Sequence, residues 1–240
     1  MPAPILGKRI YSNGATLDLA ISGWDCLFDG PESDPVSATD GADGVIIAWE
    51  RYNIPAGTFT DICAQRVTAA HTVLWGANGV TVREAADYQR EPRITSDDAG
   101  GAIVTWLDGG HIYTQRIDVT GTLLWPAAGI PVCTAAGGQE KVQIIEDGAG
   151  GAFIVWQDGR GSDLDIYRQR IAVNGALLWM TDGIIVCNAA DDQDYPSLVS
   201  DNGGGVLVAW RDGRDTNYDV YAQLINIISE QLNRTPLGRI

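Results

Sequence analysis

Positive charge is scarce in this chain of 240 residues. It has 16 lysines and arginines against 31 aspartates and glutamates, a formal charge of −15, and its only lysines are Lys8 and Lys141. An acidic protein repels phosphate groups and anionic lipids, which argues against nucleic-acid partners and membrane insertion. Histidine is also rare. The chain has only His71 and His111, which are too few for a multi-histidine zinc site.

Long apolar runs are missing as well. No run approaches the roughly 18–20 residues that a membrane-spanning helix needs. The first six residues are too short for a signal peptide. No segment keeps a helical period of 3.6 residues, so we expect almost no helix. Hydrophobic residues still make up 45% of the chain, which predicts a globular protein rather than a disordered one.

Glycine and tryptophan are abundant, and they mark an internal repeat. The chain contains 29 Gly and 8 Trp. Four segments with a Gly-rich start, an apolar run and a final tryptophan align with one another: residues 40–49, 97–106, 147–156 and 201–210. Their final residues, Trp49, Trp106, Trp156 and Trp210, are 57, 50 and 54 residues apart. A period near 50 is typical of a four-stranded propeller blade, which takes roughly 40–50 residues.

The rest of the period repeats too. Each Trp-ending run is followed by a polar loop and a Tyr-Gln-Arg-like run, and in three units by a second tryptophan: Trp75, Trp125 and Trp179. The apolar runs are short, rich in Val and Ile, and bounded by Gly, Asp and Asn, which is typical of β-strands joined by tight turns. Such meanders must stack to bury their apolar faces, and a closed ring removes their free edges.

These patterns predict a single all-β domain over residues 1–240, a β-propeller of four blades. Five blades, or a fragment of a larger ring, are the alternatives. The predicted units cover residues 35–91, 92–141, 142–195 and 196–232. Residues 5–34 match the second half of a unit. We therefore expect this partial unit to close the ring, with the N-terminal strand pairing beside the last blade.

The repeat resembles that of secreted bacterial β-propeller proteins, in which Trp-x-Asp-x-Arg precedes Asp-Ile-Tyr-x-Gln-Arg. The third unit carries the two halves at residues 156–160 and 165–170, and the fourth at 210–214 and 219–223. The first unit departs from the pattern with Cys63 in place of the tyrosine. The resemblance implies an extracellular or cell-surface propeller, and it implies no particular activity.

The acidic loops after the Trp-ending runs are the strongest candidate site. In the third and fourth units they gather carboxylate and amide oxygens at Asp158, Asp163, Asp165, Asp212, Asp215, Asn217 and Asp219. Calcium takes six to eight oxygen ligands, so one hypothesis is a calcium site. The other hypothesis is that Arg160 and Arg214 pair with these carboxylates and that no cofactor is required.

Other recurring features have structural explanations. An aspartate precedes the Gly-rich turn of every unit, which fits a hairpin better than a phosphate loop, because no helix follows. The Trp-ending runs favour packing between blades over sugar stacking. Cys26, Cys133 and Cys187 occupy equivalent positions of different units, so we expect Cys133 and Cys187 not to be bonded to each other.

These features favour a non-catalytic binding or scaffold module whose ligand is a protein or a carbohydrate. Near-identical units suit such a module, whereas a catalytic site needs one unit with unique residues. One alternative is a carbohydrate-active enzyme, sialidase-like or another glycosidase, which needs two carboxylates at a set spacing. The other alternative is a structural subunit of a surface assembly.

Overall fold

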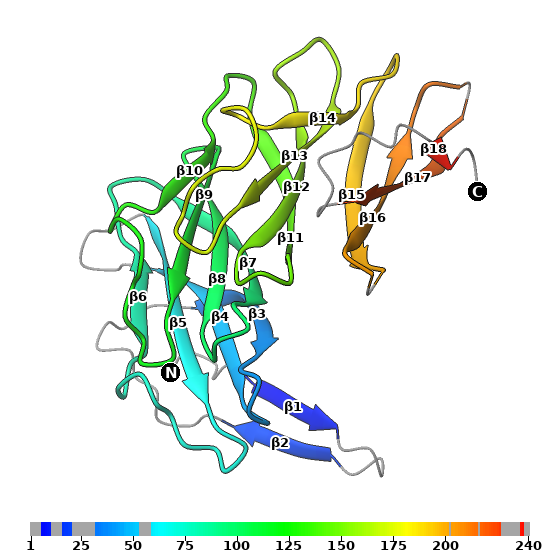
Figure 1. Cartoon of the computed structure of the whole chain (residues 1–240). Helices are drawn as coiled ribbons and strands as arrows, with labels where there is room; N and C mark the ends of the chain where they lie inside the picture. Colours follow the sequence, from blue (N-terminus) through cyan, green and yellow to red (C-terminus); the bar gives the residue numbers. More distant parts are fainter. Residues whose placement is uncertain are drawn as a thin grey trace.

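All regular structure in the described part of the chain is β-strand. The computed structural model describes residues 6–10, 16–20, 32–52, 59–201, 203–215, 217–226 and 236–237. These form four antiparallel sheets of four strands each and one separate hairpin (Figure 1). Among them, no helix is long and apolar enough to cross a membrane. The all-β fold class expected from the sequence is confirmed.

The chain builds the sheets one after another. The separate hairpin consists of β1 (Leu6–Ile10) and β2 (Thr16–Ala20). The first sheet contains β3 (Glu32–Thr39), β4 (Val45–Tyr52), β5 (Thr60–Val67) and β6 (Val80–Arg83). The second contains β7 (Gln89–Ser96), β8 (Ala102–Asp108), β9 (His111–Ile117) and β10 (Ile130–Cys133). The third contains β11 (Gln139–Glu146), β12 (Ala152–Asp158), β13 (Asp165–Ile171) and β14 (Ile184–Cys187). The fourth contains β15 (Gln193–Ser200), β16 (Gly205–Asp212), β17 (Asp219–Asn226) and β18 (Pro236–Leu237).

An aspartate shapes the hairpin between the first and second strands of each sheet. In the third sheet, Oδ1 of Asp147 accepts hydrogen bonds from the backbone N–H groups of Ala149 and Gly151, both at 2.9 Å. Its Oδ2 accepts a hydrogen bond from Nε of Arg170 in β13, at 2.8 Å. The first two sheets repeat this pairing with Asp40–Arg66 and Asp97–Arg116. Turn geometry and charge pairing thus account for the recurring aspartate.

Each first strand also contains a β-bulge. One non-glycine residue of each bulge has a φ between 48° and 53°: Asp34, Glu91, Lys141 and Tyr195. The sequence interpretation began each unit just after this point, whereas the sheets begin three residues earlier, at 32, 89, 139 and 193. The residues before the bulge look like a turn in the sequence, but the strand pairs on both sides of the bulge.

The apolar core lies between neighbouring sheets. The first strands β3, β7, β11 and β15 contact one another in that order, and the sheets follow an arc in Figure 1. Ile46 and Ile62 of the first sheet share one buried cluster with Val104 and Trp106 of the second. Similar clusters join the second sheet to the third and the third to the fourth. The tryptophans of the second strands are all buried, and each strand continues two or three residues beyond them: Trp49, Trp106, Trp156 and Trp210.

Hydrogen bonds to one backbone carbonyl strengthen the first two junctions. The indole Nε1 of Trp75 and Nη1 of Arg66, both from the first unit, donate to the carbonyl oxygen of Val119 in the second, at 3.1 and 3.2 Å. Trp125 and Arg116 of the second unit bind the carbonyl oxygen of Val173 in the third in the same way, whereas Trp179 of the third unit is half-buried and packs on Phe153.

Among the described residues the N-terminal strand does not pair beside the last sheet, whereas closure of a ring by residues 5–34 stays a prediction. β1 pairs with β2, and the fourth strand of the last sheet is β18, in which Leu237 pairs with Ala222. The last unit therefore has an outer half of its own. The sequence obscured it, because residues 227–237 lack the second tryptophan and the Gly-Ile-x-Val pattern of the other units.

Recurrent glycines beside the tryptophans make a test of this packing. Gly183 has a φ of +82°, and a Cβ there would overlap the Trp156 ring and lie 2.7 Å from the Arg168 carbonyl oxygen. Gly138 has a φ of +78°, and a Cβ there would meet no atom within 4 Å. Positive φ alone costs roughly 1–2 kcal/mol for alanine. In urea denaturation, Gly138→Ala should lose about that much stability and Gly183→Ala clearly more. Equal losses would contradict this packing.

Candidate functional site

The loop after β12 is organised by a buried ion pair. The side chain of Asp158 is fully buried, and it accepts hydrogen bonds from Nη2 of Arg160 at 2.6 Å and from Nε1 of Trp156 at 2.7 Å. The guanidinium of Arg160 lies over the Tyr167 ring, 3.9 Å from its centroid. Trp156, Asp158, Arg160 and Tyr167, the four residue types of the repeat motif, thus form one stacked, hydrogen-bonded cluster.

The fourth sheet repeats this cluster. Asp212 is fully buried and accepts hydrogen bonds from Arg214 at 2.5 Å and from Trp210 at 2.8 Å. Arg214 lies 4.2 Å from the centroid of the Tyr221 ring. The arginine hypothesis for these two carboxylates therefore matches the observed contacts.

A thiol from the preceding sheet contacts the arginine of each of these two clusters. Nη2 of Arg160 lies 3.1 Å from Sγ of Cys133, which is at the end of β10, and Arg214 approaches Cys187 at the same distance. Burial raises the pKa of Cys133 to about 12, so its thiol stays protonated. Both cysteines, and the buried Cys63, are free thiols in the structure, whereas Cys26 lies outside the described residues.

The first two units also have an arginine–carboxylate pair at this end of the sheet, but they form it with different residues. In the second, Arg83 occupies the position of the cysteine and pairs with Asp108 at 2.8 Å, so the charge comes from the neighbouring sheet. In the first, Arg51 replaces the buried aspartate and pairs with Asp61 at 3.1 Å. An arginine–carboxylate pair thus recurs at this end of every sheet. The arginine and the carboxylate come from different positions of the repeat in different sheets.

The electrostatics agree with a structural role for the pair. Burial alone would raise the pKa of Asp158, but the hydrogen bonds from Arg160 and Trp156 outweigh it, and the pKa lies below its usual value. Asp165 pairs with Asp158 across the hairpin. Burial, and then the charges of Asp158 and Asp163, raise the pKa of Asp165.

The structure divides the predicted calcium ligands into two groups. Asp158 and Asp212 are buried against arginine, and Asp165 and Asp219 are their cross-strand partners. The other three, Asp163, Asp215 and Asn217, are exposed. In the part of the chain that the structure describes, no three His, Cys, Asp or Glu side chains come together as a metal site.

The exposed group lines a cavity between the loops of the third and fourth units. Its volume is about 380 Å³, and its wall consists of Asp163, Asp191, Asp192, Gly213, Asp215, Asn217 and Tyr218. The sequence interpretation missed Asp191, Asp192 and Tyr218, although the acidic run before β15 was a visible signal. The cavity is rich in hydrogen-bond acceptors and has one aromatic side.

An arginine between two tyrosines adjoins this cavity. The guanidinium of Arg211 lies 4.2 Å from the ring centroid of Tyr218 and 4.8 Å from that of Tyr195. Its two hydrogen bonds to Asp194 are short, from Nε at 2.7 Å and from Nη2 at 2.5 Å. The hydrogen bonds that Arg211 donates to Asp194 raise the pKa of Arg211, which therefore stays charged. Tyr218 is held in a defined position by this contact.

A second cavity, of about 670 Å³, lies at the opposite, hairpin end of the first two units. Arg66 pairs with Asp40 at 2.9 Å within the first unit, and the hydroxyl of Thr95 in the second sheet donates to Glu146 of the third at 2.9 Å. Asp98 also lines this cavity, and burial, together with the charges of Glu146, Asp97 and Asp147, raises its pKa. Because Arg66 and Glu146 already have partners within the protein, this cavity is the weaker candidate.

Glu50 is the buried carboxyl most like a catalytic acid. Burial raises its pKa, and the nearby charge of Asp34 adds to the shift. However, Glu50 Oε1 accepts the backbone N–H of Glu91 in the next sheet at 2.7 Å. Gln157 makes the equivalent contact to the backbone N–H of Tyr195 at 3.2 Å. Because a neutral amide fills the same role, Glu50 is explained as a link between sheets.

Comparison with known proteins identifies the fold. No family model matches the chain, and no curated protein matches its sequence. A protein of unknown function from Dyadobacter fermentans has a TM-score of 0.54 at 11% identity, over 81% of this chain and 66% of that one. A levansucrase variant from B. megaterium has a TM-score of 0.50 at 10% identity, over 94% of this chain and 71% of that one. The chain is similar in structure to β-propeller glycoside hydrolases and to propellers of unknown function.

Replacing the arginine of one pair tests how much the pair contributes to the free energy of unfolding. Arg160→Ala leaves the buried Asp158 charge without its partner, so we expect a loss of about 2–3 kcal/mol in urea denaturation at pH 7. Arg90→Ala, at an exposed arginine, should change stability by less than about 0.5 kcal/mol. The lowered pKa of Asp158 stabilises the fold above the unfolded value of about 3.9. The gap between parent and Arg160→Ala should therefore shrink as the pH falls below that value.

The calcium hypothesis gives a different result. An ion that binds only the folded state raises its stability. A melting temperature that falls in EDTA, with the effect abolished by Asp163→Ala, would contradict the arginine account.

Proposed function

We propose that the protein is a non-catalytic binding module, extracellular or displayed at the cell surface, that binds a basic segment of a partner protein. The proposed site is the acidic cavity between the loops of the third and fourth units. This reading extends the resemblance to secreted bacterial propellers, and it needs no cofactor.

The observation that carries the proposal is a contrast between two kinds of carboxylate. The buried carboxylates at the loop ends of the sheets are matched by arginine. At the cavity wall, Asp163, Asp191 and Asp215 are exposed, and within the described residues none of them has Lys or Arg at salt-bridge distance. A ligand that brings positive charge and hydrogen-bond donors would complement this wall.

Tyr218 supports a protein ligand in particular. Its ring is about half exposed, and Arg211 fixes its position. Tyrosine and arginine are enriched among the residues that dominate binding energy in protein interfaces. Tyrosine in particular gives a large contact area with little loss of entropy. An anionic ligand would be repelled by the four carboxylates of the wall and by the charge of −15.

The enzyme alternative has less support. A glycosidase needs two carboxyl groups roughly 5–9.5 Å apart on either side of a bound sugar. Glu50 has a raised pKa, but both of its oxygens accept hydrogen bonds, from Glu91 and from the hydroxyl of Ser33. The structural-subunit alternative predicts that no ligand enters the cavity.

A titration with short charged peptides tests the proposal. We expect a labelled (Gly-Arg)5 peptide to bind in fluorescence anisotropy, and to bind more weakly as salt rises from about 25 to 150 mM. Tyr218→Ala should raise the Kd at least about fivefold, as for a residue worth over 1 kcal/mol. Asp191→Asn should raise it about two- to fivefold.

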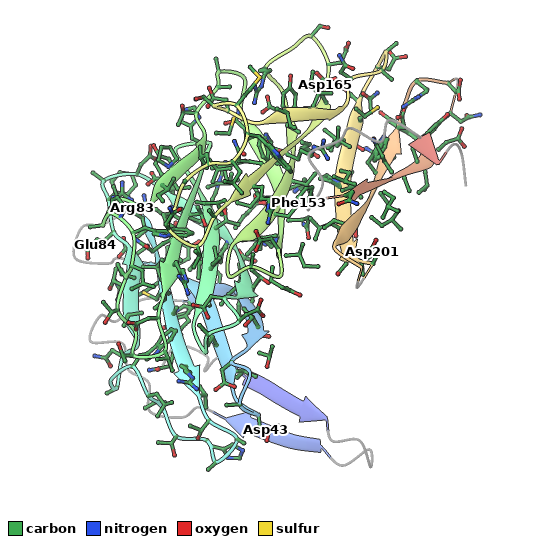
Figure 2. All side chains as sticks on the ribbon, in the orientation of Figure 1. Asp43, Arg83, Glu84, Phe153, Asp165 and Asp201 are labelled. Carbon is green, nitrogen blue, oxygen red and sulfur yellow. The ribbon has the colours of Figure 1, made fainter. Side chains whose placement is uncertain are left out.

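Asp43→Asn is the matched control. Asp43 is an exposed aspartate with a φ of 64°, close to the 58° of Asp191, and it lies far from the loop of Asp165 (Figure 2). Its substitution should leave the Kd unchanged. Equal effects of the two Asn variants would show general attraction to an acidic protein and would contradict the site. Binding of a neutral pentasaccharide that Tyr218→Ala abolishes, without peptide binding, would favour a carbohydrate ligand instead, and protection by calcium alone would favour the ion.

A further inference from the structure

One face of the fourth sheet is largely apolar, and no further sheet among the described residues packs on it. This free face contains Val199, Leu207, Ala209, Val220 and Leu224, and the strand pairing places Ser197, Arg211 and the buried Ala222 on the same side. Val199 is 56% exposed, Val220 53% and Leu224 43%. A row of this size is unusual on a sheet that otherwise packs against neighbours.

The repeat shows what this face does elsewhere. Ile62, Ile112 and Ile166 occupy the position of Val220 in the first three sheets, and each is 0% exposed. In the third sheet, Ile166 belongs to the buried cluster that joins it to the fourth sheet. The free face is therefore the surface with which every other sheet receives the next one.

The hairpin β1–β2 has a complementary gap. The Gly-Lys-Arg-Ile sequence at residues 7–10 matches the Arg-Gln-Arg-Ile of β13 at 168–171, and both are followed by Asn-Gly. In all four sheets such a third strand pairs with a second strand on one edge and a fourth strand on the other. Among the described residues, β1 pairs with β2 alone. Within the described ranges, no strand occupies the place of a second strand at its other edge.

We propose that the free face is a docking surface for a partner β-hairpin with the sequence of the first half of this repeat. Such a hairpin has a first strand, an Asp-Gly-x-Gly-Gly turn and a second strand that ends in tryptophan. Its apolar side would cover Val199 and Val220 as β15–β16 covers the third sheet, and its second strand would pair with the free edge of β1. The hairpin and β1–β2 together would make a fifth blade between the two ends of the arc in Figure 1.

The choice of occupant follows from the pairing. A strand added to an open edge gains main-chain hydrogen bonds, and the pockets beside it select the side chains. The face is shaped for the repeat's own second strand, because Val206, Val208 and Trp210 fill the equivalent place on the third sheet. A second copy of this chain does not have a free hairpin to give, because each of its four first-half hairpins already lies within a sheet.

A synthetic peptide of residues 139–158 tests the proposal, because it carries the first half of the third unit. We expect labelled peptide to bind the full chain saturably and to raise its melting temperature. Val220→Lys, on the free face, should raise the Kd at least tenfold. Ile185→Lys, at a β-branched residue of β14 that is 43% exposed, should change it less than twofold. A peptide with Ile154→Asp and Trp156→Asp, which loses the side that contacts the preceding sheet, should bind at least tenfold more weakly.

Amide exchange and sedimentation complete the test. Bound peptide should slow amide hydrogen exchange at residues 6–10, because β1 gains a partner strand. Lack of saturable binding, equal effects of Val220→Lys and Ile185→Lys, or unchanged exchange at residues 6–10 would each overturn the proposal. A dimer that Val220→Lys dissociates, without peptide binding, would overturn it in favour of a second copy.

Discussion

Burial of one sheet by the next is the constraint on which the rest of this structure depends. A four-stranded meander has two faces, and the apolar clusters here lie between sheets, as when Ile154 and Trp156 of the third pack with Ile103 and Ile112 of the second. Each sheet can thus bury its apolar residues only if a neighbour is present, and stability is a sum of nearest-neighbour terms. The same constraint explains why an end sheet with one neighbour has an unusual surface.

The second constraint is the handling of charge in an acidic protein. Each loop end buries one arginine–carboxylate pair, and the unit that lacks a loop arginine takes Arg83 from the neighbouring sheet for Asp108. A buried pair does not by itself guarantee stability, since desolvation offsets much of the attraction. It does fix the geometry of the junction, because the donors are shared between sheets. Part of the remaining negative charge is exposed at the cavity near Asp191, where a ligand can reach it.

The sequence predicts the sheets well and their junctions less well. The period of the tryptophans, the Asp-Gly turns and the lack of helical periodicity were enough for an all-β propeller of repeated meanders. The bulge at Lys141 was invisible, because a non-glycine residue at positive φ leaves no local signature and is held by pairing on both sides. The outer strand β18 was missed, since two residues that pair with Ala222 and Gln223 do not form a recognisable run.

The candidate site was half visible in the sequence. Counting oxygens located the acidic loops but did not separate Asp158, which arginine holds, from Asp163, which is exposed, because that difference depends on burial. Asp191 and Tyr218 belong to different segments, and only the fold places them beside one cavity. Repeat symmetry supplied a physical argument for Glu50, because the neutral Gln157 makes the same contact two junctions further along.

Hydrogen exchange of the backbone amides tests the central claim, that each sheet is stabilised by its neighbours, most directly. The amides of β12 and β13, whose sheet is covered on both faces, should be the most protected and should exchange by global unfolding. The amides of β16 and β17, whose sheet has one neighbour among the described residues, should exchange faster through local opening. Equal protection of the third and fourth sheets would contradict the account, because it would show that a sheet does not need a second neighbour.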